Sequence, residues 1–145
     1  LGYGYKVAVT QFIKGTWDCR ERDVFESNPN LSIHVTGTGF TWETQDRELD
    51  RKACRAAWEQ TLPMLQDASI HLVLLDEITY MLKYGYLEIE EVLAALKSRP
   101  ENQSVILTGR AAHRDLQAYA DTVSEIRDEK HAFNAGIKAQ KGIDW

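Results

Sequence analysis

Two short and nearly continuous apolar runs constrain the fold of this chain more than any other feature. Ile70–Leu75 (IHLVLL) and Ser104–Thr108 (SVILT) each have the length of a strand and carry apolar residues on both faces. The segment between them, Glu88–Ser98, has the spacing of an amphipathic helix and ends before Pro100, because a proline disfavours helical backbone in the residue before it. Such strands, joined through helices, predict a parallel sheet that is covered on both sides.

The rest of the chain continues this alternation and predicts a single α/β domain over residues 1–145. A chain of this length buries roughly 70% of the surface that it exposes when unfolded, which is enough for a core. A polar loop is expected between the first two strands. The further strands that the pattern predicts are Tyr5–Ile13, Leu31–Thr36 and Thr122–Ile126, and the further helices are Asp46–Gln66 and Ala111–Ala120.

Charge and cysteine content narrow the classes of function. The chain has 17 basic and 22 acidic residues and a net charge of −5, which disfavours a general nucleic-acid binder because phosphate neutralisation needs a basic face. Cys19 and Cys54 lie far apart and form no CxxC motif, so a disulfide framework or a zinc ribbon is not indicated and a cytoplasmic location is expected. No apolar run approaches the ~18 residues of a membrane span.

The residues that follow the strands are the best functional signal, because ligands of open parallel sheets bind at the carboxyl ends of the strands. Asp76 and Glu77 follow one buried strand, and Gly109 and Arg110 follow another. Two carboxylates at this position suit Mg²⁺, which binds rigid oxygen ligands, and an arginine suits a phosphate. The alternatives are a strand that simply reaches the surface, and an arginine paired with a surface carboxylate.

Other catalytic motifs are missing from the sequence. The phosphate cradle G-x-x-x-x-G-K-[ST] does not occur, and Gly37-Thr38-Gly39 lacks the third glycine of a dinucleotide fingerprint. The histidines show no HExxH spacing, and no G-x-S-x-G elbow is present. His34 and His71 lie inside predicted strands, where a structural role is the more common one. A hydrolytic triad and a structural zinc site are therefore not indicated.

Several further segments run through the chain: VTQFIKGTW, GTGFTWETQDRE, LVLLDEITYMLKYGYL, VILTGR, HRDL, ADTVSEI and KHAFNAGIKAQKGIDW. Together, and in matching order over essentially the whole chain, they resemble the ATP:corrinoid adenosyltransferases of the bacterial cobalamin pathway. The resemblance implies a P-loop, RecA-like α/β fold and transfer of the 5′-deoxyadenosyl group of ATP to the cobalt of a reduced corrinoid, such as cob(I)alamin or cobinamide, with release of triphosphate. It also implies Mg²⁺, a homodimer, and an electron donor such as a flavodoxin or a reduced flavin.

The resemblance assigns roles to individual residues. Glu77, with Asp76 beside it, resembles the Mg²⁺-binding acid of the family, and Arg110 the arginine that reaches the nucleotide phosphates. Met81 and Tyr84 lie on the segment that lines the corrinoid cleft. Phe40 and Trp42 match the aromatic pair that closes under the corrin ring. The family's P-loop precedes the first residues of this sequence, so we expect the sequence to be N-terminally incomplete.

The pair Phe40 and Trp42 then has a chemical purpose. Cobalt(II) with an axial ligand resists reduction to the nucleophilic cobalt(I), and each ~59 mV gained in a one-electron step corresponds to ~1.4 kcal/mol. Two aromatic rings that bury ~150–250 Å² each, at ~25 cal/mol/Å², supply several kcal/mol towards a dry, unligated lower face. The alternatives are a pair that packs under the following helix, a P-loop-like ATPase or kinase of other specificity, and a corrinoid-binding module without enzymatic activity.

Overall fold

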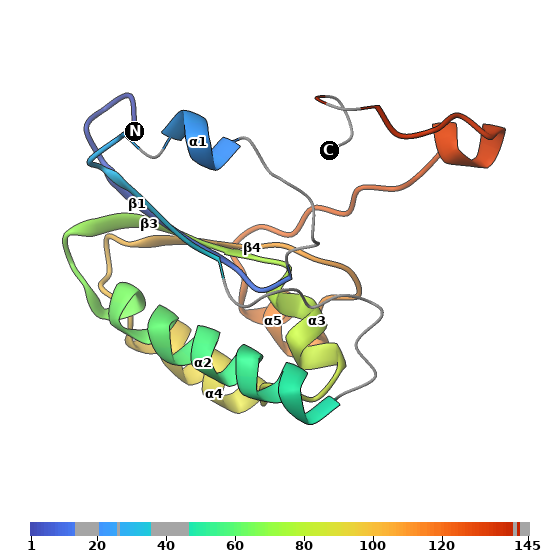
Figure 1. Ribbon diagram of the computed structural model, residues 1–145. Helices are drawn as coiled ribbons and strands as arrows, with labels where there is room; N and C mark the ends of the chain where they lie inside the picture. The colour runs from blue at the N-terminus through green and yellow to red at the C-terminus, as the bar shows by residue number, and fades with distance from the viewer. Residues whose placement is uncertain (14–20, 26, 36–46, 141, 143–145) are drawn as a thin grey trace.

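The fold is a four-stranded parallel sheet with helices packed against it, as a computed structural model shows (Figure 1). The structure describes residues 1–13, 21–25, 27–35, 47–140 and 142. The strands are β1 (Lys6–Gln11), β2 (Leu31–Val35), β3 (Ile70–Asp76) and β4 (Ser104–Leu107). Their order in the sheet is β2-β1-β3-β4, and every neighbouring pair is parallel. The predicted α/β class and parallel sheet are therefore confirmed.

The helices connect these strands. They are α1 (Glu21–Phe25), α2 (Arg47–Gln66), α3 (Ile78–Lys83), α4 (Ile89–Ser98) and α5 (Arg114–Tyr119), followed by a 3₁₀ turn, η1 (Ala132–Ala135). In Figure 1 the helices α2 to α5 lie on one side of the sheet, and the short α1 lies on the other. None of the helices in the described part of the chain combines the length and the hydrophobicity that a membrane crossing requires.

The core lies between the sheet and the helices α2 and α4. Alternate strand residues point towards this layer, and Ala8, Val73 and Leu75 have no exposed surface. Fully burying a valine or leucine side chain, as at Val73 and Leu75, contributes about 1.5–3 kcal/mol. The helices add Cys54, Ala57, Trp58, Met64 and Leu65 from α2 and Val92 and Leu96 from α4.

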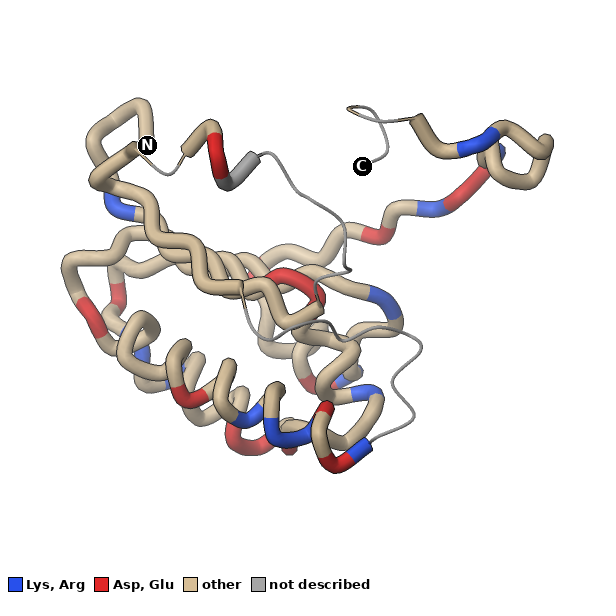
Figure 2. Tube along the Cα trace, viewed as in Figure 1, with Lys and Arg blue, Asp and Glu red and all other residues tan. Residues whose placement is uncertain are grey.

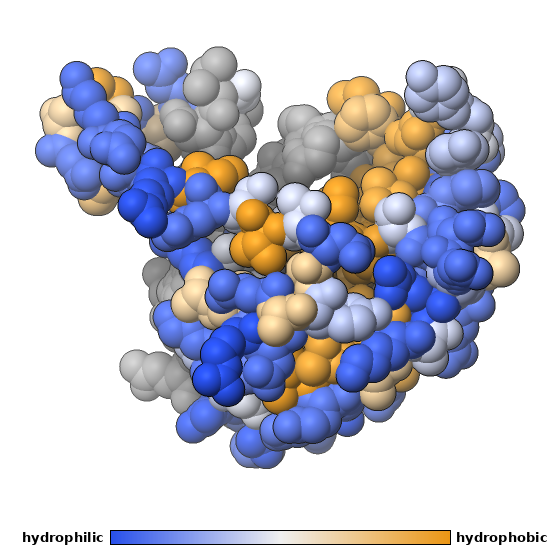
Figure 3. Space-filling view, turned by 180° about the vertical axis from the view of Figure 1, so that it is seen from behind, coloured by the Kyte–Doolittle hydropathy of each residue, from blue (hydrophilic) through white to orange (hydrophobic). Residues whose placement is uncertain are grey.

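The opposite face of the sheet is less completely covered. Val9 and Leu74 point to this face and are half-buried, and 48% of Ile106 is exposed. Figure 3 shows hydrophobic side chains between hydrophilic ones on the side of the molecule that Figure 1 hides. The apolar runs predict strands buried on both faces. Among the described residues, the face against α2 and α4 is buried and the opposite face is half-buried or exposed.

Local sequence explains the ends of the helices. Glu88 and Glu91 form a capping box at the start of α4, in which each side chain accepts a hydrogen bond from the other residue's backbone N–H. The helix ends at Ser98, and Arg99 donates from Nη1 to the carbonyl of Leu96 over 2.7 Å. The predicted helix over Ala111–Ala120 is shorter, because α5 begins after His113, which accepts a hydrogen bond from the N–H of Asp115.

The predicted strand Thr122–Ile126 is wrong. This segment has no regular structure, Val123 is 56% exposed and Ile126 is 98% exposed. After α5 the chain leaves the body of the domain, as Figure 1 shows, so the segment gains no neighbouring strand to bond with. A β-type residue pattern stabilises a strand only through such pairing, because its preference comes from packing on a pleated surface.

Candidate functional site

The carboxyl ends of β3 and β4 bring together the acidic and basic residues that the sequence singled out. Because β3 and β4 are parallel neighbours, Asp76 at the end of one lies beside Thr108 after the other. Figure 2 shows an acidic segment where β3 ends and a basic residue in the loop after β4. The segments that follow β1 and β2, with Lys14-Gly15-Thr16, Phe40 and Trp42, lie outside the described residues, so the roles of Phe40 and Trp42 stay predictions.

Thr108 links Asp76, the last residue of β3, to Glu77, which follows it. Its Oγ1 donates to Oδ1 of Asp76 over 2.7 Å and accepts from the backbone N–H of Glu77 over 3.0 Å. Its own N–H donates to the carbonyl of Leu75 over 3.1 Å. Both bonds of the hydroxyl are of normal length. One side chain therefore fixes an oxygen of Asp76 and the backbone of Glu77 together.

Glu77 has an unusual backbone and an unusual carboxylate. It precedes α3 with φ 61° and ψ 20°, the left-handed conformation that costs a non-glycine residue about 1–2 kcal/mol. Its Oε2 is buried, with no hydrogen-bond partner among the described residues. Burial raises the pKa of this carboxyl, as does the nearby charge of Asp76, and the charge of Arg110 partly offsets this. A buried carboxylate oxygen without a donor is ready to receive a cation.

Contacts of Gly109 and Thr79 position Arg110 near the two acidic residues. Oγ1 of Thr79 donates to the carbonyl of Arg110 over 3.0 Å, and the N–H of Thr79 donates to the carbonyl of Thr108 over 3.5 Å. Gly109 has φ 139°, and a Cβ built there would lie 2.0 Å from Oγ1 of Thr79 and 3.3 Å from Oε2 of Glu77. The loop after β4 therefore needs a glycine at this position to pass so close to the start of α3.

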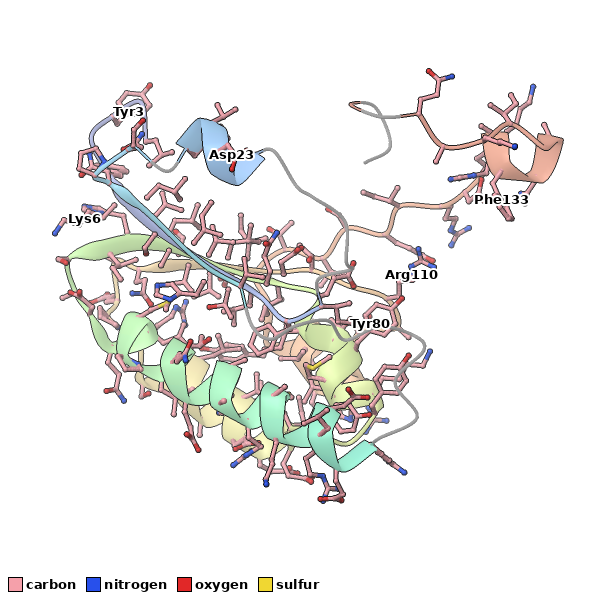
Figure 4. All side chains as sticks on the ribbon, in the orientation of Figure 1. Tyr3, Lys6, Asp23, Tyr80, Arg110 and Phe133 are labelled. Carbon is pink, nitrogen blue, oxygen red and sulfur yellow. The ribbon has the colours of Figure 1, made fainter. Side chains whose placement is uncertain are left out.

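The side chain of Arg110 is exposed at this end of the sheet, where Figure 4 labels it beyond β4. It forms no ion pair with a carboxylate of the described residues, so the alternative role in a surface ion pair has no support there. A guanidinium in this position is available to bind an oxyanion.

The acidic pair fits Mg²⁺ better than a metal that needs an all-protein cage. Within the ranges that the structure describes, no group of three or more His, Cys, Asp or Glu side chains is placed to hold a metal ion. Mg²⁺ commonly takes one or two carboxylates and completes its shell with water and substrate phosphates. Asp76 and the buried Oε2 of Glu77, which no donor in the described ranges contacts, supply what this mode requires.

An aromatic row lies on and after α3. The rings of Tyr80 and Tyr84 stack with centroids 5.9 Å apart, and Tyr84 and Tyr86 are tilted with centroids 5.8 Å apart. Nη2 of Arg47 donates to the carbonyl of Tyr84 over 3.1 Å, which joins the start of α2 to this row. Met81 is fully buried in the core, and Tyr84 is half-buried. Figure 4 labels Tyr80 on α3, near the carboxyl ends of the strands.

Sequence reasoning missed the hydroxyl groups of this site. The sequence pattern indicates Thr108 only as the last residue of a strand, and it predicts no helix in the segment that contains Thr79. A signal was present, because Thr108 is the one polar residue between an apolar strand and the Gly109-Arg110 pair. A separate groove of about 400 Å³ lies between α2 and α4, where Trp58, Leu62, Leu65 and Glu91 are among its lining residues, and it includes none of the site residues.

The family model and three similar known proteins all point to one family of enzymes. The sequence model of the family described as ATP:corrinoid adenosyltransferase BtuR/CobO/CobP matches residues 1–145. The chain is 55% identical over 145 residues to a corrinoid adenosyltransferase of Escherichia coli K12, and 54% identical to the corrinoid adenosyltransferase CobA of Salmonella typhimurium. It is 49% identical to a corrinoid adenosyltransferase of Pseudomonas aeruginosa. In each comparison all of this chain is matched, against 74%, 74% and 72% of the relative.

Proposed function

The chain belongs to the ATP:corrinoid adenosyltransferase family, and from this premise we propose how its residues share the transfer of the adenosyl group of ATP to the cobalt of a corrinoid. Cobalt(I) of the substrate is the nucleophile, and the triphosphate is the leaving group. The protein's part is therefore to position the two substrates, neutralise the leaving group and exclude water. A protein that supplies no nucleophile of its own agrees with the sequence, which shows no nucleophilic triad.

Glu77 and Asp76 form the magnesium side of the site in this proposal. The observation that carries it is the buried Oε2 of Glu77, which has no hydrogen-bond partner in the described part of the chain. Mg²⁺ bound there would supply positive charge for the triphosphate. Asp76 keeps one oxygen on the hydroxyl of Thr108, so its carboxylate is held in a fixed orientation towards this edge of the sheet.

Arg110 binds phosphate oxygens in this proposal. Its guanidinium is exposed, lies at the same edge as the two carboxylates and is close enough to affect the pKa of Glu77. A planar guanidinium donates two parallel hydrogen bonds to a phosphate group, which fixes orientation as well as charge. The P-loop, RecA-like fold type proposed for the chain is consistent with its parallel sheet and with a phosphate site at the carboxyl ends of the strands.

Phe40 and Trp42 cover the lower face of the corrin ring in this proposal. Its support is the sequence itself, in which both residues belong to the segment between β2 and α2, and the family to which the chain belongs. Two rings that leave water on closing contribute several kcal/mol at ~25 cal/mol/Å², and ordering the loop costs ~1–2 kcal/mol per residue. Tyr84, half-buried at the same end of the sheet, is proposed to line the cleft, and buried Met81 to support it by packing.

One variant of each half of the site tests this assignment. Trp42→Ala is expected to lower cobalt–carbon bond formation about 100-fold with cobalt(II) substrate plus a reductant, because ~3 kcal/mol of desolvation is lost. The loss should be smaller when cobalt(I) is supplied directly, and Trp42→Phe should recover most of the activity. Equal and minor losses with both substrates would exclude the aromatic role.

Glu77→Gln tests the other half. It is expected to weaken the affinity for ATP in the presence of Mg²⁺ and to leave the affinity without Mg²⁺ unchanged, because only a carboxylate ligand is removed. Glu101→Gln is the matched control, since Glu101 is exposed in the turn before β4, at the other end of the strand. Mg²⁺ dependence equal to that of the unmodified chain would remove Glu77 from the site.

A further inference from the structure

We propose that Thr108 is a positioning residue, which sets the orientation of Asp76 and Glu77 for the Mg²⁺ complex of ATP without binding it. This inference rests on the proposed function of those two carboxylates. Neither the sequence motifs nor the comparisons assign a role to this threonine. Its evidence is the set of hydrogen bonds that its hydroxyl and backbone make with the end of β3.

The hydroxyl of Thr108 donates one hydrogen bond and accepts another. Its single proton goes to Oδ1 of Asp76 at 2.7 Å, and a lone pair accepts the N–H of Glu77 at 3.0 Å. A hydroxyl offers one donor and two acceptor lone pairs, so no proton remains for a substrate. Thr108 thus acts through its two neighbours, and one oxygen of Asp76 is held while the carboxylate keeps its charge for a cation.

The bond to Glu77 also explains how a strained residue is kept in place. Glu77 has a left-handed backbone, and its own side chain makes no capping hydrogen bond to the helix α3 that it precedes. Strained residues persist where their surroundings fix them, and here the N–H of Glu77 is fixed by Thr108. The conformation directs the carboxylate towards Gly109, where Oε2 is buried and has no hydrogen-bond partner among the residues that the structure describes. Loss of the hydroxyl would release the backbone that aims this oxygen.

The branched side chain adds rigidity to this arrangement. Threonine has restricted rotation about χ1, so its oxygen stays where the two hydrogen bonds need it. Valine has nearly the same shape and lacks the hydroxyl, whereas serine keeps the hydroxyl and loses the restriction. Thr108→Val and Thr108→Ser therefore separate hydrogen bonding from packing at one position.

The experiment measures metal affinity rather than turnover. Mn²⁺ is titrated into the full chain with ATP, and bound metal is read by electron paramagnetic resonance. Thr108→Val should weaken Mn²⁺ binding about tenfold or more, as expected when hydrogen bonds to a charged group are lost, and Thr108→Ser should stay within about threefold of the unmodified chain. In turnover, Thr108→Val should raise the KM for metal–ATP more than it lowers kcat.

A buried threonine elsewhere provides the structural control. Oγ1 of Thr61 donates to the carbonyl of Ala57 over 2.8 Å and lies 3.0 Å from Oγ1 of Thr10, so neither of these two contacts involves a site residue. Thr61→Val should lower stability and leave Mn²⁺ affinity unchanged. If it weakens Mn²⁺ binding as much as Thr108→Val, or if Thr108→Val binds like the unmodified chain, the positioning role is refuted.

Two further variants complete the design. Should Thr108→Val not fold, Thr108→Ala removes the hydroxyl with less steric change, and the same comparison with Thr108→Ser decides the outcome. Glu77→Gln separates the two proposals. Weak Mn²⁺ binding by Glu77→Gln together with unchanged binding by Thr108→Val overturns only the role of Thr108, whereas unchanged binding by Glu77→Gln overturns the proposed metal site itself.

Discussion

Replacing Gly109 by alanine is expected to be more damaging than any ordinary loop substitution. A residue other than glycine is strained at φ 139°, by about 1–3 kcal/mol. The new Cβ would lie 2.0 Å from Oγ1 of Thr79, a distance that cannot be kept. Moving that hydroxyl loses its bond to the carbonyl of Arg110, worth about 0.5–1.5 kcal/mol, and an off-rotamer side chain costs a similar amount. The expected loss of unfolding free energy is about 2–6 kcal/mol.

Gly85→Ala is the matched control for this prediction. Gly85 also has positive φ, 67°, but nothing lies within 4 Å of a Cβ built there. Its substitution therefore measures backbone strain alone, about 1–2 kcal/mol. With an m-value of about 2 kcal/mol/M, urea midpoints followed by circular dichroism should fall by about 1–3 M for Gly109→Ala and about 0.5–1 M for Gly85→Ala.

A double variant checks the cause of the difference. If the collision with Thr79 dominates, Thr79→Ala in the Gly109→Ala background should cost less than it does alone, because the clashing oxygen is already displaced. Strictly additive losses, or a Gly109→Ala midpoint no lower than that of Gly85→Ala, would refute the close packing of the loop after β4 against the start of α3.

Two further predictions concern the core. Gln103→Leu should lower the unfolding free energy by about 2–4 kcal/mol, because Nε2 of this buried glutamine donates to the carbonyls of Met64, Asp67 and Ile70. Gln117→Leu is the control, since Gln117 is exposed. Equal urea midpoints for the two variants would contradict this prediction. Burial raises the pKa of Cys54 from 9.0 to about 12, so this thiol should resist alkylation at pH 8.5 until urea unfolds the chain. Peptide mass spectrometry locates the labelled cysteine. Rapid labelling of Cys54 in the native protein would disprove the prediction. Between these two pKa values only the unfolded chain releases the proton, so stability should fall as the pH rises above 9.0, with a slope that Cys54→Ala lacks.

The strands and long helices were predictable because buried elements show a recognisable pattern of apolar residues in the sequence. β4 lies within the apolar run that predicted it, and β3 extends beyond its predicted run by one residue, to Asp76. α2 and α4 begin within a residue of the predicted starts. The same reasoning placed Asp76, Glu77 and Arg110 at one edge, because parallel neighbours end together. The predicted strand at Thr122–Ile126 failed for the opposite reason, since its local preference has no neighbouring strand to pair with.

α3 (ITYMLK) shows what local preference leaves open. Its isoleucine, threonine and tyrosine favour strands, yet the segment is a helix whose first four residues are buried. A helix of six residues is too short to be stable by itself, so its stability comes from packing. The sequence offered no periodic signal for it, and sequence reasoning predicted no element there.

At Glu77 the local conformational preference of the residue conflicts with the backbone conformation that the fold requires. A glycine at position 77 would relieve the strain, and yet the chain has a glutamate there whose buried oxygen has no partner among the described residues. Both features cost stability, and natural sequences keep such costs mainly where function requires them. Thr108 and Thr79 offset part of this cost through bonds that join residues about 30 positions apart, and such contacts leave no local pattern in a sequence. The acidic residues of the site could therefore be read from the sequence, whereas the hydroxyl groups that orient them required the structure.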